Sequence, residues 1–201
     1  MEYIGDVFYD YGGGLYANIT NQCPCRCEFC IRDMVDSLGD ADSLWLKREP
    51  SLEEIFELLK EWNLDKYSEV VFCGYGEPTA RLDELLEVAR HIKANHNIKI
   101  RINSNGLSDL LNGRETAPEL EGVIDAVSIS LNTSDAAKYD ALCHPVYGED
   151  AFAEILEFTR KVKAYVPDVT MSVVGGTIPA EDVEKCRRIA TADLGVKFRV
   201  R

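Results

Sequence analysis

The chain has 201 residues, 46% hydrophobic and 28% charged, which is typical of a folded globular domain and excludes a disordered or fibrous chain. The formal net charge of -13 excludes a broad basic surface for phosphate, so we expect no nucleic-acid partner. The sequence has no run of about 18 apolar residues and no signal-peptide pattern, so we expect no membrane association and a cytoplasmic location. One domain over residues 1–201 is expected.

Strand-like and helix-like segments alternate along the chain. A first core strand is expected over residues 15–20, preceded by an extra strand over 3–8 and by three flexible glycines. Ser51 and Glu54 form a capping box before an amphipathic helix that continues to residue 62. The remaining expected segments are strands over 69–73, 98–103, 126–131, 169–174 and 197–201, and helices over 82–92, 118–120, 135–139, 151–164 and 181–190.

This alternation predicts an α/β fold with a mostly parallel sheet, because parallel strands need helical crossovers. Six strand–helix units, without a seventh or eighth, predict an open partial (β/α)6 barrel of the kind in which the active site lies at the carboxyl ends of the strands. The segments that follow the first four core strands are rich in polar and cysteine residues. We therefore expect them to share one mouth: residues 23–30, 74–79, 103–106 and 130–132.

Four cysteines lie within the segment 23–30, and such crowding is more typical of metal ligation than of disulfides. The spacing Cys23-x3-Cys27-x2-Cys30 supplies three thiolates, whereas an iron–sulfur cubane takes four ligands, so one iron would stay open for a chelating substrate. In this interpretation Cys25 is a bystander in the loop. The alternative is a zinc site that uses all four cysteines.

The cysteine spacing, with Phe29 directly before the last cysteine, resembles the signature of the radical S-adenosylmethionine (SAM) superfamily. The resemblance implies one [4Fe-4S] cluster held by Cys23, Cys27 and Cys30, with SAM chelating the open iron. In that superfamily one electron cleaves SAM to a 5′-deoxyadenosyl radical, which abstracts hydrogen from the substrate. The resemblance also implies reduced flavodoxin or ferredoxin as the electron donor. A non-catalytic iron–sulfur or zinc-binding module is the alternative function.

The segment after the second core strand resembles the Gly-Gly-Glu-Pro motif of the same superfamily, whose glutamate binds the SAM amino group. Glu77 would accept a charge-assisted hydrogen bond, and Gly76 would let the backbone approach the ligand. Tyr75 departs from the motif, although Gly74 stands one residue earlier. An ordinary strand-end turn is the alternative. The expected SAM-binding set here is Gly74, Tyr75, Gly76, Glu77 and Pro78.

Polar residues at the ends of the next two strands are further candidates for SAM. Asn103 ends the third core strand, and Ser130 and Asn132 end the fourth, where members of the superfamily often carry small polar residues that contact the ribose. Each of the three could equally be a capping or turn residue. We keep all three as candidate cofactor-binding residues.

Three residues are candidates for the substrate side because their expected positions face the same mouth: Cys73, His144 and Arg199. The alternative for Cys73 is a small buried hydrophobic residue, and the alternative for His144 is a plain loop residue. Cys186 is expected in the core on a helix.

Three stretches, residues 18–32, 71–79 and 128–132, resemble the short radical SAM proteins associated with TatD-type hydrolases, and the likeness covers residues 15–201. That group implies no particular reaction. Radical SAM proteins of similar length include glycyl-radical activases, which act on a protein, and 7-carboxy-7-deazaguanine synthases, which act on a small heterocycle. The resemblance therefore implies that the substrate is a protein or a small molecule. It also implies association with a TatD-type hydrolase. Because the other cysteines are scattered, we expect a single cluster.

Overall fold

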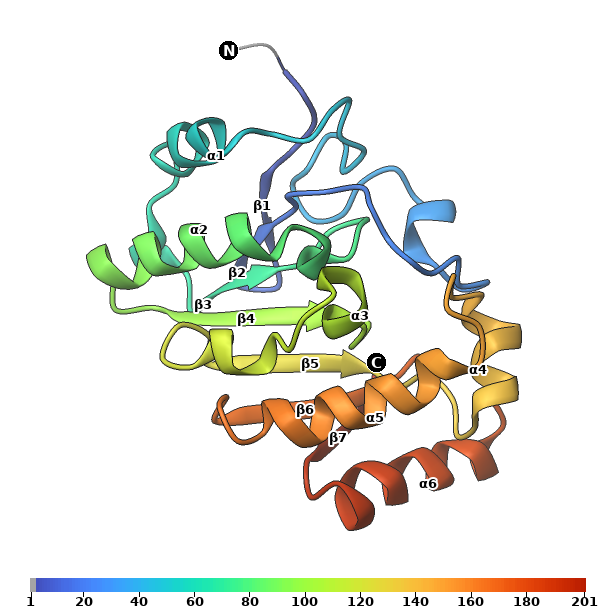
Figure 1. Cartoon of the computed structure of the whole chain (residues 1–201). Helices are drawn as coiled ribbons and strands as arrows, with labels where there is room; N and C mark the ends of the chain where they lie inside the picture. The colour runs from blue at the N-terminus through green and yellow to red at the C-terminus, as the bar shows by residue number, and fades with distance from the viewer. Residues whose placement is uncertain (1–2) are drawn as a thin grey trace.

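The computed structural model describes residues 3–201 as one sheet with helices packed against it (Figure 1). The strands follow one another in chain order across the sheet. β1 and β2 pair antiparallel, and every neighbouring pair from β2 to β7 is parallel. The sheet is not closed, so the fold is the expected α/β partial barrel. The strands are β1 Phe8–Tyr11, β2 Gly14–Ala17, β3 Glu69–Phe72, β4 Lys99–Ser104, β5 Ala126–Ser130, β6 Asp168–Val173 and β7 Lys197–Val200.

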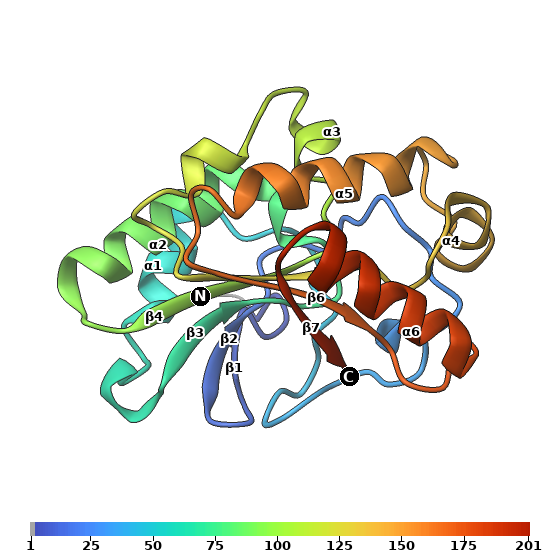
Figure 2. The same cartoon turned by 90° about the horizontal axis from the view of Figure 1, so that it is seen from below.

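The helices connect the parallel strands, and the long helices α2 and α5 cover one face of the sheet (Figure 2). The expected capping box begins α1, since the Glu54 amide donates to the Ser51 hydroxyl and the Ser51 amide donates to the Glu54 carboxylate. The helices are α1 Leu52–Leu59, α2 Leu82–Asn95, α3 Ser108–Asn112, α4 Ala136–Cys143, α5 Asp150–Val162 and α6 Ala180–Arg188.

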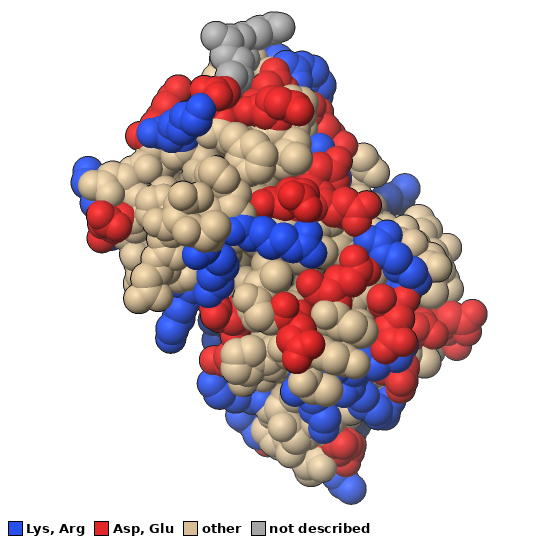
Figure 3. Space-filling model, turned by 60° about the vertical axis from the view of Figure 1, so that its left-hand side comes forward, with Lys and Arg blue, Asp and Glu red and all other residues tan. Residues whose placement is uncertain are grey.

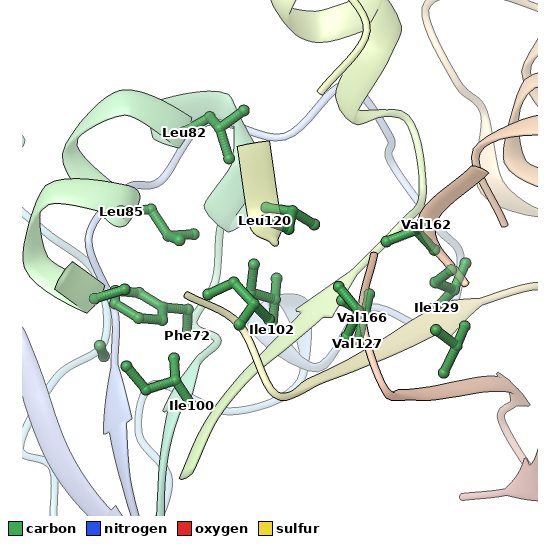
Figure 4. Close-up of a cluster of buried hydrophobic side chains, with 14 of the residues drawn as sticks. Phe72, Leu82, Leu85, Ile100, Ile102, Leu120, Val127, Ile129, Val162 and Val166 are labelled. Atoms are coloured by element: carbon green, nitrogen blue, oxygen red, sulfur yellow. The ribbon is translucent and has the colours of Figure 1, made fainter. Parts of the chain in front are cut away.

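The core lies between the sheet and these helices. Apolar residues at alternate strand positions point toward the helices, so that Phe72 of β3 and Ile102 of β4 lie beside Leu85 of α2 and Leu120 (Figure 4). Burying each such side chain contributes about 1.5 to 3 kcal/mol. The residues between them on the same strands face the other side of the sheet, and most of these are polar.

Both expected amino-terminal strands are present, but their expected bounds are wrong. The extra strand is Phe8–Tyr11 instead of residues 3–8, and the first core strand is Gly14–Ala17 instead of residues 15–20. The cause is the turn between them, where two glycines both have positive φ, 58° and 83°. Such a pair closes a two-residue hairpin, which fixes where both strands begin and end.

Two short helical segments differ from expectation. The segment expected as a helix at 118–120 is part of the 3-10 turn Ala117–Leu120, and the helix expected at 135–139 extends over Ala136–Cys143. Helix α3 was not expected, because its five residues are too few to show a helical period. It ends at Gly113, which has a φ of 62°.

Charged side chains of both signs mix on the molecular surface. On the face drawn in Figure 3, acidic and basic side chains lie next to one another and no continuous basic area is visible. Many form exposed pairs, such as Arg90 with Glu87 at 2.9 Å, and each such pair contributes about 0 to 1 kcal/mol. Over residues 3–201, no helix has the length and apolar composition needed to cross a membrane.

Candidate functional site

The cysteine loop follows β2 and lies on the side toward which β4 and β5 point (Figure 1). Its backbone is tied to the end of α4: the amides of Arg26 and Glu28 donate to the carbonyls of Cys143 and Leu142, at 2.9 and 3.1 Å. The loop is therefore held by two elements that are far apart in sequence. This is the carboxyl edge of the parallel strands, where α/β folds carry their sites.

The four loop cysteines differ in exposure. Cys23, Cys27 and Cys30 are partly exposed, whereas Cys25 is only 3% exposed. The Sγ atom of Cys25 lies 3.9 Å from the hydroxyl of Tyr139, a fully buried residue of α4. Cys25 is thus the buried member of the four, although its thiol stays in contact with those of Cys23 and Cys27.

Neighbouring thiols shift the ionisation of the loop cysteines. Hydrogen bonds from Cys143 and Cys25 lower the pKa of Cys27 to about 4, and a hydrogen bond from Cys25 lowers the pKa of Cys23. The same interactions raise the pKa of Cys25, which therefore stays a thiol. Burial raises the pKa of Cys30. Because the thiolate is the form that ligates a metal, Cys23 and Cys27 are suited to that role.

The donor set of this loop fits a thiolate-bound iron–sulfur cluster in its chemistry. Within residues 3–201, no three Cys, His, Asp or Glu side chains are arranged as ligands of a single metal ion. The ligands of a [4Fe-4S] cubane bind different irons, so they need not converge on one atom. The assignment of Cys23, Cys27 and Cys30 as cluster ligands stays a prediction.

The loop after β3 packs directly on the cysteine loop, and its glycines allow this approach. A Cβ atom on Gly76 would stand 2.3 Å from the carbonyl oxygen of Thr20, and one on Gly74 would stand 2.0 Å from the side-chain oxygen of Asn18. Pro78 then opens a 3-10 turn, at a position where a missing amide hydrogen costs nothing. Both glycines are therefore required for the contact between the two motif-bearing loops.

Tyr75, which replaces the first glycine of the expected motif, has a structural role. It is 3% exposed and belongs to a small apolar cluster with Tyr9 and Leu44. Its ring packs edge-on against Trp45, with 5.1 Å between the ring centroids, and its hydroxyl donates to the carbonyl of Val35. Tyr75 thus holds the long segment after the cysteines against the sheet.

The Glu77 carboxylate joins the end of β3 to the end of β4. Oε1 accepts from the Thr79 amide at 3.1 Å, the Thr79 hydroxyl at 2.7 Å and the Ser104 hydroxyl at 2.8 Å, and Oε2 accepts from the Asn105 amide at 2.7 Å. Burial raises the pKa of Glu77, and these bonds act in the opposite direction. The Glu77 amide donates to the Gln22 carbonyl at 2.7 Å, which ties this carboxylate to the cysteine loop.

Asn103 and Ser130 lie on the sheet face that points away from the long helices. The Oδ1 atom of Asn103 accepts from Arg101 at 2.7 Å, within its own strand. The hydroxyl of Ser130 lies 3.0 Å from a guanidinium nitrogen of Arg201. Both residues are therefore near the mouth, and both already have partners from this face.

Asn132 lies beside the cysteine loop. It is 3% exposed and has a φ of 60°, a conformation that asparagine tolerates better than most residues. Its Nδ2 atom lies 3.6 Å from the Sγ of Cys143, while its Oδ1 atom is buried without a hydrogen-bond partner. A buried acceptor without a donor costs about 1 to 3 kcal/mol, so a ligand that donates to this oxygen would remove that cost.

The three substrate-side candidates occupy different places. Cys73 follows β3 on the polar face of the sheet, and Arg199 of β7 reaches across that face to the Ser128 hydroxyl at 3.3 Å. His144 caps α4 with a φ of 44°, and its Nε2 lies 3.5 Å from a carboxylate oxygen of the cysteine loop. Cys186 is fully buried in the core, as expected.

Two further residues lie near the cysteines. The Nδ2 atom of Asn105 lies 4.0 Å from the Sγ of Cys23 and 3.9 Å from that of Cys25. Asn105 belongs to the segment 103–106, which the sequence predicts at the mouth. Cys143 interacts with the Cys27 thiol, and no local pattern announces this, because the contact depends on how α4 packs.

Comparison with known protein families decides the relationship of this chain. The model of the Radical SAM superfamily matches residues 17–190. The chain belongs to the radical SAM superfamily. Members of this superfamily are enzymes that use a [4Fe-4S] cluster and SAM.

Individual relatives resemble the chain over most of its length. A GTP 3′,8-cyclase of Erythrobacter litoralis is 26% identical over 160 residues, which cover 75% of this chain and 42% of the relative. A radical SAM methyltransferase from Sphaerobacter thermophilus superimposes with a TM-score of 0.68 and 16% identity over 96% of this chain and 57% of its own. Streptococcus suis SuiB bound to S-adenosylmethionine superimposes with a TM-score of 0.59 and 16% identity, over 92% and 37%. The chain spans 42% to 46% of the length of the curated relatives it matches.

Proposed function

We propose that this radical SAM protein reductively cleaves SAM at one [4Fe-4S] cluster held by Cys23, Cys27 and Cys30. The observation that carries the proposal is the arrangement of the cysteine loop, in which Cys23, Cys27 and Cys30 are partly exposed and Cys25 is buried. Three thiolates leave one iron of a cubane without a protein ligand, which is the vacancy a chelating substrate needs. When bound, the cluster supplies the electron that splits SAM into methionine and a 5′-deoxyadenosyl radical.

The residues of the chain prepare this site in three ways. The Cys143 and Cys25 thiols favour the ionised form of Cys27, which is the form that binds iron. Gly76 lets the Glu77 loop touch the cysteine loop, so that both motifs are positioned together. Asn132 offers a buried oxygen that lacks a donor.

The SAM-binding assignment extends to the residues that line the mouth. Glu77 is proposed to accept from the SAM ammonium, because its Oε2 atom has a single protein donor and a carboxylate oxygen can accept more than one bond. Asn132 is proposed to accept from a SAM hydroxyl through its unpaired Oδ1. The other proposed SAM contacts are Gly74, Tyr75, Gly76, Pro78, Asn103 and Ser130.

The finer relationships are also proposals. The three stretches 18–32, 71–79 and 128–132 support a place among the TatD-associated radical SAM proteins, with a TatD-type hydrolase as partner and reduced flavodoxin or ferredoxin as electron donor. The described residues form one continuous sheet, which supports a single core domain. The substrate is proposed to be either a protein, as for an activase, or a small molecule.

The test is SAM cleavage by anaerobically reconstituted protein reduced with dithionite, with 5′-deoxyadenosine as the measured product. The wild type is expected to form it, Cys27→Ala is expected to lose both product and cluster, and Cys25→Ala is expected to keep the cluster. Cys25→Ala removes a thiol of the same loop that helps to ionise Cys27 but is not proposed to bind iron, so it separates ligation from this supporting role. Tight zinc occupancy without SAM cleavage would instead indicate the non-catalytic binding module, and loss of the cluster in Cys25→Ala would overturn the ligand assignment.

A further inference from the structure

The sheet has one apolar face and one polar face, and only the apolar face is covered by the long helices (Figure 2). Strand alternation places polar side chains of the four strands β4 to β7 on the other face. No helix of residues 3–201 lies below the central strands in this view. The side chains of this polar inner face, as we call it, include Arg101, Asn103, Ser128, Ser130, Ser172, Lys197, Arg199 and Arg201.

Two of the four cations named above for the polar inner face are neutralised by carboxylates. Arg101 makes a two-pronged contact with Glu69, at 2.6 and 3.0 Å, across the β3–β4 pair. Lys197 pairs with Asp168 at 2.8 Å. These two cations therefore have partners that balance their charge within the protein.

The other two cations have neutral partners. Arg199 donates to the Ser128 hydroxyl at 3.3 Å, and Arg201 donates to the Ser130 hydroxyl at 3.0 Å. Among the side chains of residues 3–201, neither guanidinium forms an ion pair with a carboxylate, although the chain carries a net charge of -13. Each serine oxygen accepts from one nitrogen of its guanidinium. A guanidinium has five N–H donors, so further donors remain for a ligand.

Both arginines are exposed, and the backbone of Arg201 is held at the carboxyl end of the sheet. The amide of Arg201 donates to the Val173 carbonyl and its own carbonyl accepts from Gly175, each at 2.9 Å, so its backbone continues the β6–β7 ladder. Burial lowers the pKa of Arg201 and the adjacent Arg199 lowers it further, while the Cys73 and Cys27 thiols raise it. Arg201 therefore lies within electrostatic reach of the cysteine loop.

We propose that Arg199 and Arg201, held by the hydroxyls of Ser128 and Ser130, form a binding site for an anionic group through their guanidiniums, so that the substrate carries a carboxylate or a phosphate. Guanidinium groups bind both anions through paired N–H donors. An anion there would offset two adjacent like charges that pair with no carboxylate of residues 3–201. The inference rests on the proposed function, since it names the substrate class of the same site.

The overall charge of the protein makes this site distinctive. A chain with a net charge of -13 repels anions in general, so affinity for an anion requires a local arrangement that overcomes this repulsion. The two serines contribute by orienting the guanidiniums before the ligand arrives. Preorganised donors lose less freedom on binding than mobile surface side chains do.

Arginine-selective modification tests the proposal on the reconstituted wild-type protein. Phenylglyoxal is added in the presence of inorganic phosphate, succinate or, at equal ionic strength, sodium chloride, and the modified arginines are quantified by mass spectrometry. Phosphate or succinate at about four times its dissociation constant is expected to slow modification of Arg199 and Arg201 about fivefold. Arg187 is the internal control, because it sits on the opposite side of β7 over Phe198 and should show no protection.

The pattern among the additives distinguishes the possible sources of the effect. Protection by phosphate alone indicates a phosphorylated substrate, and protection by succinate indicates a carboxylate. Equal protection by chloride would mean simple screening and would overturn the proposal. Protection of the same arginines by SAM, without any by phosphate or succinate, would overturn it as well, because the site would then serve SAM.

A variant supplies an independent check. Arg201→Gln is expected to reduce the protection of Arg199 by the effective anion at least threefold, because the two guanidiniums share the ligand. Arg187→Gln removes the same charge from the outer side and should leave the protection of Arg199 intact. Undiminished protection in Arg201→Gln would refute the shared site. Failure of the wild type to cleave SAM would refute the proposed function and leave this protection pattern unaffected, since the modification assay requires no turnover.

Discussion

Replacing Glu77 with glutamine tests how the motif loop is held, independently of any cofactor. Oε1 and Oε2 of Glu77 accept four hydrogen bonds from three residues, Thr79, Ser104 and Asn105. An amide retains only one acceptor oxygen. If that oxygen keeps the three donors at the Oε1 position, the new NH2 group faces the Asn105 amide hydrogen, so that one donor meets another.

The expected loss of unfolding free energy follows from this one broken hydrogen bond. A buried donor without an acceptor costs about 1 to 3 kcal/mol, and the remaining bonds weaken because they are no longer charge-assisted. The neutral amide offsets part of this loss, because burial of the Glu77 charge itself is unfavourable. We expect Glu77→Gln to lower the free energy of unfolding by about 2 kcal/mol, which is about a 1 M change in a urea midpoint.

The assay is urea unfolding of the cluster-free protein, followed by circular dichroism under reducing conditions. Glu87→Gln is the control, because Glu87 is an exposed glutamate that pairs with Arg90 on the surface of α2. Its effect should stay within about 0.5 kcal/mol. Equal midpoints for the two variants, or a Glu77→Gln protein more stable than wild type, would refute the tie between the ends of β3 and β4.

Three further variants test neighbouring parts of the account. Gly76→Ala should destabilise the protein by about 1 to 3 kcal/mol in the same urea assay, because its Cβ would lie 2.3 Å from a backbone oxygen; a neutral effect would contradict the close loop contact. Tyr75→Phe should cost about 1 kcal/mol by removing the bond to the Val35 carbonyl, and unchanged stability would mean that this bond is absent in solution. Hydrogen bonds from Lys138, Lys185 and Ser134 lower the pKa of Asp182 in the folded protein. The stabilisation that the charged Asp182 gives to the fold is therefore complete above the unfolded pKa of about 3.9 and is lost as pH falls through the lower folded pKa. The stability difference between wild type and Asp182→Asn should therefore be constant from about pH 5 to 8 and shrink below about pH 4; a difference that grows in acid would contradict this sign.

The sequence allowed the order of strands and helices to be predicted because each element carries its own periodic pattern. The capping box at Ser51 is a local arrangement, and it appears where expected. The placement of the first two strands failed because the pattern alone does not show which residues a turn will occupy. Two glycines with positive φ decided that register.

The candidate site was predictable only where its residues lie in one short segment. The cysteine spacing and the Glu77 loop could be found in this way. The roles of Tyr75 and Cys143 could not, because Tyr75 packs on Trp45 and Cys143 meets Cys27 only after the chain has folded. That Arg201 meets a serine and no carboxylate among residues 3–201 was equally hidden, since it depends on which side chains the fold brings near it.

The central claim is that three cysteines hold the cluster and leave one iron for SAM. The most direct measurement is the magnetic coupling between the reduced cluster of the wild-type protein and SAM labelled with ¹⁵N in its amino group. We predict a resolved nitrogen coupling that disappears when SAM is omitted, together with no cluster in Cys27→Ala. A cluster that shows no coupling to labelled SAM, or a protein that holds zinc through all four loop cysteines, would contradict the account.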